Sequence, residues 1–473
     1  MDVRAPSAGL EALARRVRCD LELLDYPRRP WLEARATAAG EPIYDVVIVG
    51  AGQSGLTAAF GLARERIGNV LVLDQNPLDR AGPWLNFARM RTLRTPKYLT
   101  GPDLGIPSLT PRAFYEAEHG EGSWEALGLI PKELWAAYLA WYRQTLGIPV
   151  QPDTRVGTLD YDASERAFLV PCEAPSGTRT LRARRVVLAT GIDGSGQWRV
   201  PSAVSEALPK RLYAHTREPI DFEALRGKRV AVLGAGASGF DNAATALEQG
   251  AGEVHLLFRR QQLVNVNAYR WAEFVGFLKH LADLPDAEKW RFILQILRMG
   301  QLPPADTLAR ATQQRNFHLH AGSGWRRLAP SGDGVVIETD SSRFEVDFVI
   351  VATGFVTDLG TRPELARFEP HIARWSDRYT PPASESHEDL LRHPYLGSSF
   401  EFTERRAGAA PYLNHLYNYT FGGLLSMGFG GGSISGLKYS AQRLVAGITR
   451  SFFVEDCAAH YRGLQSFAET EFG

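Results

Sequence analysis

A glycine-rich turn that follows an apolar strand and opens a helix occurs twice in this chain. The first copy is VVIVGAGQSGLTAAFGLA, residues 46–63, and the second is VAVLGAGASGFDNAATAL, residues 230–247. In such a turn the first glycine permits a tight bend, the second lets the backbone approach a pyrophosphate, and the third lets the helix pack closely on the strand. The N–H groups at the helix N-terminus then face the phosphates. The two copies therefore predict two Rossmann-like dinucleotide-binding units.

The residue that ends the second strand distinguishes the two units. In the first unit, NVLVLDQN places Asp74 about 20 residues beyond the glycines, where a carboxylate accepts hydrogen bonds from an adenosine ribose. In the second, EVHLLFRR ends in Arg259 and Arg260, whose guanidinium groups favour a 2′-phosphate. We therefore expect FAD or NAD at the first site and NADPH at the second. Two such sites make sense if a hydride passes from NADPH to a flavin, so FAD is expected at the first.

The pattern of strands and helices divides the chain into four stretches. We expect an N-terminal helical arm at 1–40, the first part of an FAD-binding domain at 41–205, an NADPH-binding domain at 206–340 with a helical insertion at 261–314, and the second part of the FAD-binding domain with C-terminal helices at 341–473. Both RRVVLATG, residues 184–191, and FEVDFVIVATGF, residues 344–355, are typical of a buried strand that ends at a glycine. We expect the second of these to return the chain to its first domain. The fold class is α/β, with a discontinuous FAD-binding domain and an inserted NADPH-binding domain.

Composition excludes several other classes of protein. The 473 residues are 44% hydrophobic, enough for two or three cores, and Lys plus Arg equals Asp plus Glu at 53 each, which does not favour nucleic acid as a partner. Cys19, Cys172 and Cys457 include no CxxC pair, so neither a disulfide framework nor a dithiol centre is expected. With neither a signal peptide nor a membrane span in the pattern, we expect a cytoplasmic protein without a membrane partner. His318 and His320 alternate in FHLHA without carboxylate or thiolate partners at ligand spacing, so no metal is expected.

A third glycine turn lies near the C-terminus. GFGGGSISGLKYSAQRLVAGI, residues 428–448, reads as a turn that opens a helix. The N-terminus of this helix, next to Gly432 and Gly436, suits the N1/C2 carbonyl region of a flavin ring, where it would stabilise negative charge. A purely structural turn is the alternative.

Together these motifs resemble the class B flavin-dependent monooxygenases over residues 41–460. The resemblance rests on the two glycine fingerprints, Gly82-Pro83-Trp84, Ala189-Thr190-Gly191, and Asp347 followed by Ala352-Thr353-Gly354-Phe355. More narrowly, MRTLRTPKYLTGPDLGIPSLT and FGGGSISGLKYSAQRL are similar to bacterial FAD-dependent urate hydroxylases and to a sister group that N-oxidises aspartate. The family's FxGxxxH stretch keeps only its histidine, His215, which argues against a Baeyer–Villiger reaction.

The resemblance implies that reduced flavin captures O2 as a C4a-(hydro)peroxide and transfers one oxygen atom to a small polar nitrogenous substrate, either an amine or amino acid or a urate-like purine. No metal is implied. Two other functions remain open at this point: a reductase that passes electrons to a non-oxygen acceptor, and a cofactor-binding scaffold or redox sensor. A homo-oligomer is possible, with the insertion as a lid or a dimer contact.

The candidate site residues follow from these motifs. Near the reacting centre we expect Gln53 and Trp84 at the flavin edge, Arg91, Arg94 and Lys97 as cations for an anionic substrate, and Asn418 as a pocket group. The three cations are alternatively a solvated basic stretch or contacts to FAD phosphates. The residues expected to bind the cofactors are Gly50, Gly52, Gln53, Ser54, Gly55, Asp74, Gln75, Trp84, Val156, Thr190, Gly191, His215, Gly234, Gly236, Ala237, Ser238, Gly239, Arg259, Arg260, Thr353, Gly354, Gly432 and Gly436.

Overall fold

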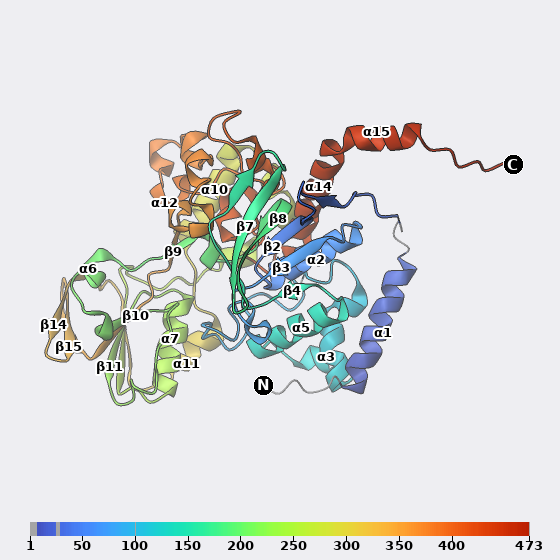
Figure 1. Ribbon diagram of the computed structural model, residues 1–473. Helices are drawn as coiled ribbons and strands as arrows, with labels where there is room; N and C mark the ends of the chain where they lie inside the picture. Colours follow the sequence, from blue (N-terminus) through green and yellow to red (C-terminus); the bar gives the residue numbers. More distant parts are fainter. Residues whose placement is uncertain (1–6, 25–28, 100, 473) are drawn as a thin grey trace.

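The computed structural model describes residues 7–24, 29–99 and 101–472, and it contains two sheet-based units (Figure 1). The larger sheet has the order β4-β3-β2-β8-β7-β5, with β19 also paired to β8. Its parallel part consists of β4 (Val150–Gln151), β3 (Val70–Leu73), β2 (Pro42–Val49), the end of β8 (Gly177–Leu188) and β19 (Leu416–Asn418). The start of β8 pairs antiparallel with β7 (Ala167–Ala174), which carries β5 (Arg155–Val156) and β6 (Asp160–Asp162).

Helices cover the parallel part of this sheet. Helix α2 (Gln53–Arg64) follows the first glycine turn and packs on the long helix α14 (Leu437–Glu455). The two helices approach so closely that a side chain at Gly61 would begin 2.8 Å from Val445. The neighbouring helices of this unit are α3 (Pro111–His119), α4 (Ser123–Ala126) and α5 (Lys132–Thr145).

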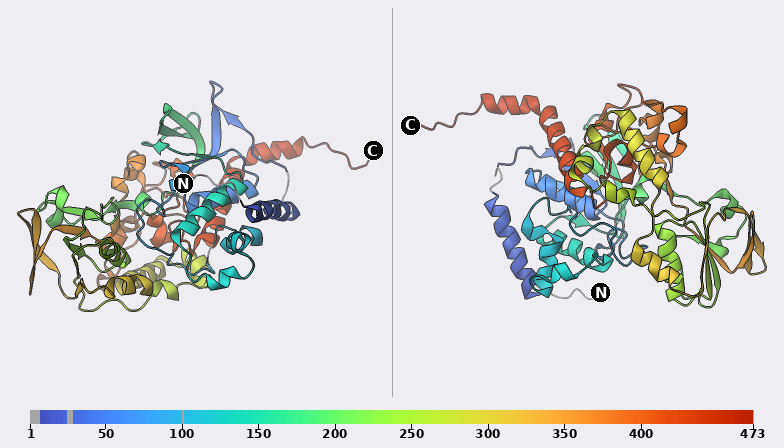
Figure 2. Two further views of the ribbon diagram at one scale, coloured as in Figure 1. Left: turned by 90° about the horizontal axis from the view of Figure 1, so that it is seen from below. Right: turned by 180° about the vertical axis from the view of Figure 1, so that it is seen from behind.

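The predicted N-terminal arm contains α1 (Ala8–Leu23), capped by Ser7. Leu10, Leu13 and Val17 are buried and α1 packs on α3, where a side chain at Gly9 would clash with a backbone oxygen. Residues 1–6 and 25–28 of the predicted arm lie outside the described residues. At the other end of the chain, α15 (Cys457–Gln465) projects away from the body (Figures 1 and 2).

The second unit has a parallel five-stranded sheet. Its order is β10 (Tyr213–His215), β17 (Phe348–Val351), β11 (Arg229–Leu233), β12 (Glu253–Leu257) and β13 (Phe317–His320), and α7 (Ala237–Glu248) follows β11. A three-stranded antiparallel sheet, β14 (Trp325–Ser331), β15 (Gly334–Thr339) and β16 (Arg343–Val346), lies beside it. The expectation that 341–351 belong to the first domain is therefore wrong. Residues 348–351 pair with β10 and β11, so the second unit ends after Val351 instead of at residue 340.

Two chain segments connect the units, and they pair with each other. β9 (Gly196–Trp198) and β18 (Phe355–Thr357) form a two-stranded antiparallel ribbon. The region expected as a helical insertion holds α8 (Ala268–Trp271), α9 (Val275–His280), α10 (Asp286–Met299) and α11 (Ala305–Thr312). The first three share a core with Trp375, Leu424 and Phe429, near α12 (Glu388–Leu391) and α13 (Leu424–Met427), whereas α11 packs on α7. The insertion thus packs on both units, with α8 to α10 against the first and α11 against the second.

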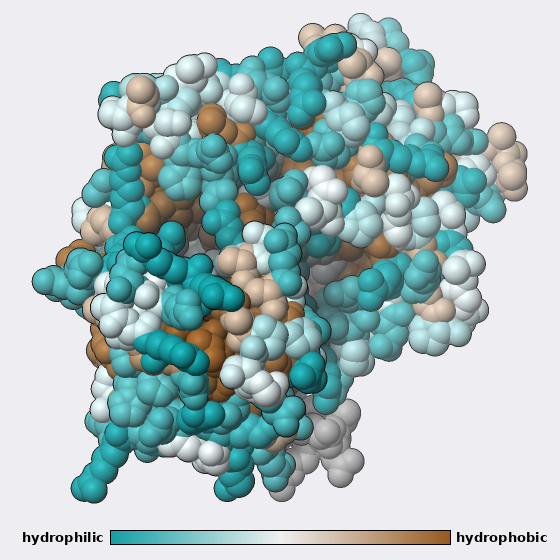
Figure 3. Space-filling model, turned by 90° about the vertical axis from the view of Figure 1, so that its left-hand side faces the viewer, coloured by the Kyte–Doolittle hydropathy of each residue, from teal (hydrophilic) through white to brown (hydrophobic). Residues whose placement is uncertain are grey.

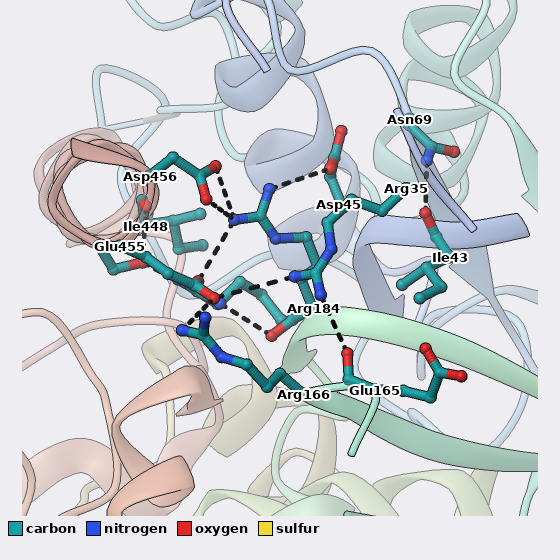
Figure 4. Close-up of polar contacts among 12 residues, drawn as sticks. Arg35, Ile43, Asp45, Asn69, Glu165, Arg166, Arg184, Ile448, Glu455 and Asp456 are labelled. Atoms are coloured by element: carbon teal, nitrogen blue, oxygen red, sulfur yellow. Dashed lines mark hydrogen bonds and ion pairs between the residues drawn. The ribbon is translucent and has the colours of Figure 1, made fainter. Parts of the chain in front are cut away.

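A buried charge cluster fixes the end of α14 to the first sheet (Figure 4). Arg184 on β8 lies 2.7 Å from Asp456, and Arg185 lies 2.6 Å from Glu455. Burial opposes ionisation of Glu455, but the two arginines outweigh it and lower its pKa to about 2. Burial raises the pKa of Asp45 in the same cluster to about 6. Asp45, Arg184 and Arg185 lie where the parallel pairing of β2 with β8 begins, whereas the first glycine turn follows the other end of that pairing. The cluster is therefore structural.

Candidate cofactor and active site

The first glycine turn has room only for glycine at two positions. Gly50 has a φ of +110°, and a side chain there would begin 2.5 Å from the backbone oxygen of Ala189. A side chain at Gly55 would begin 1.8 Å from the oxygen of Gly50. The turn is thus held between the end of β2, the start of α2 and Ala189 in the ATG motif that follows β8. No side chain at these glycines covers the backbone at the N-terminus of α2, so a diphosphate can approach it closely.

The third glycine turn lies against this helix N-terminus. The hydroxyl of Ser54 donates a hydrogen bond to the backbone oxygen of Gly431. Gly436 is the N-cap of α14, and neither Gly436 nor Gly52, the N-cap of α2, supplies a capping side chain. At Gly432 a side chain would begin 2.9 Å from Phe421. The loop that leads into α14 therefore lies against the N-terminus of α2, and the partial positive charge at an uncapped helix N-terminus favours an anionic group.

The carboxylate of Asp74 closes the other side of the first turn. It is buried and accepts hydrogen bonds from Ala51 N at 2.7 Å and from the backbone and side chain of Asn76 at 2.8 and 3.0 Å. A carboxylate has about four lone-pair sites, so Asp74 retains capacity for a ribose hydroxyl. Gln75 is exposed beside it, and Val156 is half-buried two residues beyond Thr154, whose N–H donates to Asp74 O at 2.8 Å.

Tryptophans form a wall next to α2. Trp84 is buried, and its ring meets that of Trp135 edge-on at 6.4 Å. Trp135 Nε1 donates to Gln53 Oε1 at 3.2 Å. Among the described residues Trp84 Nε1 has no hydrogen-bond partner, although it is buried. An unpartnered buried donor is costly, so Trp84 fits a ligand acceptor at this position. The sequence did not identify Trp135, because its partner lies far away along the chain.

Two more unpartnered polar groups lie at the carboxyl ends of β8 and β19. Asn418 pairs in register with Leu188, so Thr190 lies just beyond the same edge. Thr190 Oγ1 and Asn418 Nδ2 are buried without a partner in the part of the chain that the structure describes, while Asn418 Oδ1 accepts from Thr420 at 2.6 Å. Ligands of open α/β sheets bind at this edge. The unpartnered atoms of Trp84, Thr190 and Asn418 therefore fit a polar ring such as a flavin or its substrate.

The second glycine turn repeats the first in detail. Gly234 has a φ of +118°, and a side chain there would begin 2.5 Å from the oxygen of Ala352. A side chain at Gly239 would begin 2.2 Å from the oxygen of Gly234. Gly236 is the uncapped N-cap of α7, whose first residues are Ala237 and Ser238. Each ATG motif thus packs on the fingerprint of its own unit.

A cavity of about 550 Å³ opens at this second turn. Its lining includes Gly234, Gly236, Arg259, Arg260 and Thr353 from the sequence-based set, together with Arg199, Phe258, Gln262, Leu263, Val264, Gln301 and Trp325. The space-filling view of the left-hand side of Figure 1 shows apolar surface recessed between polar side chains (Figure 3). Cofactor pockets combine an apolar lining with a few polar anchors in this way.

The two arginines at this cavity differ in their surroundings. Arg259 is exposed, and its side chain lies over Gly324. Arg260 instead donates to the backbone oxygens of Met299 at 3.2 Å and Arg298 at 3.0 Å, at the C-terminus of α10. It therefore ties the insertion to the cavity, and Arg259 is the freer of the two to meet a phosphate.

His215 ends β10 and contacts the ATG motif that follows β17. The ring is buried, and its Nε2 lies 3.1 Å from the backbone oxygen of Gly354. Burial lowers its pKa. Its other nitrogen, Nδ1, accepts from Arg217 N at 3.2 Å. The role that the structure supports for His215 is thus to join β10 to the segment after β17.

The three cations expected to hold an anionic substrate do not converge. Arg91 lies 3.0 Å from Glu248, and Arg94 lies 2.7 Å from Asp241, both on α7. Lys97 Nζ instead donates to the backbone oxygen of Trp124 at 2.7 Å. Each cation has a partner of its own: two of the partners are on α7, and the third is in α4. The expectation of one anion-binding trio is therefore wrong.

Histidines also gather away from the glycine turns. The rings of His255, His318 and His320 stack on neighbouring strands, with His255 Nδ1 3.1 Å from His320 Nε2. In the described ranges no set of three or more His, Cys, Asp or Glu side chains is arranged to hold a metal. In the same described part of the chain, no helix is both long enough and apolar enough to cross a membrane.

Comparison with known proteins supports the family suggested by the motifs. Residues 44–276 match the family model described as pyridine nucleotide-disulphide oxidoreductase. The chain is 42% identical over 466 residues to the FAD-dependent urate hydroxylase of Xanthomonas campestris pv. campestris, and the match covers 98% of this chain and 97% of that protein.

Solved structures share the fold. An ornithine N-hydroxylase of Kutzneria sp. 744 has a TM-score of 0.67 at 16% identity, covering 87% of this chain and all of that one. The L-lysine 6-monooxygenase of Pseudomonas syringae has a TM-score of 0.64 at 18% identity, covering 86% and 99%. The predicted α/β fold with two nucleotide-binding units is confirmed.

Proposed function

The chain belongs to the family of the FAD-dependent urate hydroxylase, and we propose that it is an NADPH-dependent FAD monooxygenase that inserts one oxygen atom of O2 into a urate-like purine. The observation that carries this proposal is the pair of matched glycine turns, one closed by Asp74 and the other open to Arg259. FAD in the first turn would supply the oxygen-activating chemistry, and NADPH in the second would supply its electrons.

The residues of the chain bind, orient and exclude water. The uncapped N-terminus of α2 would hold the diphosphate of FAD, and Asp74 would hold its ribose. Trp84 and Trp135 close one side of the ring site against solvent. Asn418 Nδ2 offers a hydrogen-bond donor to a carbonyl acceptor of the ring or of the substrate.

The choice of a purine over an amino acid rests on relatedness and on the site. The urate hydroxylase is related over nearly the whole chain, whereas the amino-acid hydroxylases share only the fold. Since Arg91, Arg94 and Lys97 are each engaged elsewhere, the cluster of cations that would hold a dicarboxylate is missing from the described loop. A neutral donor such as Asn418 suits the carbonyl groups of a purine.

The experiment that tests the function is NADPH oxidation under 18O2 with urate, aspartate, ornithine or lysine. We expect urate to stimulate NADPH oxidation and to yield a product that carries one 18O atom. Stimulation by an amino acid instead would move the substrate to the N-hydroxylating branch. NADPH oxidation that continues without O2 when a quinone is added, with no labelled product from any substrate, would support a reductase.

A further inference from the structure

The loop that follows Trp84 has its backbone fixed to the first unit. Leu93 N donates to the oxygen of Ile130 at 2.8 Å, and Lys132 N donates to the oxygen of Arg91 at 3.0 Å. Lys132 continues into α5 of the first unit. This backbone is therefore part of the wall that also holds Trp84.

The side chains of the same loop reach the second unit. Arg94 Nη2 lies 2.7 Å from Oδ2 of Asp241, and Arg91 Nη2 lies 3.0 Å from Oε1 of Glu248. Both carboxylates belong to α7, the helix whose N-terminus opens onto the second cavity. Arg89 also reaches the second unit, where its guanidinium donates hydrogen bonds to the backbone oxygens of Thr216 and Glu218. The loop thus links the two units, in addition to the link that the β9–β18 ribbon provides.

The two ion pairs on α7 differ in burial. The Asp241 side chain is 3% exposed and lies two residues after Gly239, and its other oxygen accepts from Thr307 at 3.1 Å. Arg310 Nη1 also lies 3.9 Å from that second oxygen, which is too far for a hydrogen bond. Loss of Arg94 would therefore remove the close, hydrogen-bonded cation of a buried carboxylate and leave it only the more distant one. The Arg91 side chain is 62% exposed, and its partner Glu248 is also held by Arg310 at 2.8 Å. An exposed, redundant pair of this kind contributes little.

We propose that Arg94 and Asp241 form a positioning pair that fixes α7, and with it the second nucleotide pocket, relative to the first site. Neither Arg94 nor Asp241 lines the cavity, so the pair acts through the placement of the helix and not through nucleotide binding. Its consequence for electron transfer rests on the proposed function, because hydride transfer between two bound cofactors depends steeply on their separation. Displacements of about 1 Å away from a reacting centre can cost about 100-fold in rate.

The test uses the full-length FAD-loaded protein with Arg94→Gln, and Arg91→Gln serves as the matched control from the same loop. Three quantities are measured: hydrogen–deuterium exchange of α7 and of residues 87–94, the Kd of NADP+ by calorimetry, and the flavin reduction rate at saturating NADPH. For Arg94→Gln we expect faster exchange, a Kd within about 2-fold of the parent, and reduction slower by about 10-fold or more. Arg94→Lys should restore most of the rate, and Arg91→Gln should match the parent protein.

Other outcomes overturn the proposal. Exchange and reduction rate both unchanged in Arg94→Gln would show that the pair fixes nothing. A weaker Kd with an unchanged rate at saturation would place Arg94 in nucleotide binding instead. If Arg94→Gln fails to fold, Asp241→Asn, which keeps the shape of the side chain, takes the same three measurements. If NADPH reduces the flavin of neither the parent protein nor any variant, the proposed function fails. The difference in hydrogen–deuterium exchange between Arg94→Gln and Arg91→Gln would still show whether Arg94 and Asp241 position α7.

Discussion

Replacement of Gly234 by alanine isolates the second nucleotide site. Gly234 has a φ of +118°, and a Cβ atom there would lie 2.5 Å from the oxygen of Ala352. That oxygen is held in place, because Ala352 N donates to Leu233 O at 2.9 Å in the adjoining strand. A non-glycine residue at such a φ costs about 1–2 kcal/mol, and overpacking against fixed backbone adds about 1–3 kcal/mol. If the turn must regain its native form to bind a nucleotide, affinity falls by roughly 30-fold to several thousand-fold, at about 1.4 kcal/mol for each tenfold change.

The assay compares Gly234→Ala with the parent protein. Calorimetry with NADP+ gives the Kd, and the flavin spectrum gives the FAD content. We expect weak NADP+ binding with unchanged FAD content, whereas Gly50→Ala should lose FAD. The control is Gly227→Ala, since Gly227 has a φ of +72° but nothing within 4 Å of its Cβ position. It should lose about 1 kcal/mol of stability and no affinity. Tight NADP+ binding by Gly234→Ala would refute the reasoning.

Two further substitutions test the arginine pair and a buried histidine. Arg259→Ala should weaken NADPH binding about 10- to 100-fold and leave NADH binding within about 2-fold, because it removes charge-assisted hydrogen bonds to a 2′-phosphate. Arg260→Ala should instead lower the Tm and weaken the binding of both coenzymes, because Arg260 holds the end of α10. Calorimetry with each coenzyme measures both effects, and equal losses of NADPH and NADH binding in Arg259→Ala would contradict its role. Burial lowers the pKa of His393 to about 4, so the unfolded chain binds the extra proton as pH falls from 6.5 to 4 and stability drops by up to about 3 kcal/mol. His393→Asn, which keeps a donor toward Gly422 O, should lose less stability over that range in urea unfolding, and an unchanged pH dependence would exclude His393 as the cause.

The sequence was sufficient for the parts of the fold that depend on local chemistry. The glycine turns at Gly50 and Gly234 were recognisable because positive φ and close backbone contact leave no other residue type there. The ATG motifs were also recognisable, but the structure pairs each with the fingerprint of its own unit. The strand at 348–351 was placed in the wrong unit because a buried apolar strand carries no mark of the sheet that it joins.

The site was harder to predict because its contacts join distant segments. The cations of the loop after Trp84 were visible, but Asp241 and Glu248 are more than a hundred residues away, and only the fold brings α7 to face Arg94. In the same way, Arg260 was expected to meet a phosphate, and its engagement with the carbonyl groups that end α10 depends on where the insertion packs. Trp135 was not identified as the partner of Gln53 for this reason too.

The most direct test of the account is an anaerobic titration of the purified FAD-loaded protein with NADPH, followed by absorbance of the flavin. The account predicts a yellow protein with one FAD per chain that is bleached by one equivalent of NADPH, and much more slowly by NADH. A colourless protein that takes up no FAD, or a bound flavin that NADPH leaves oxidised, would contradict it.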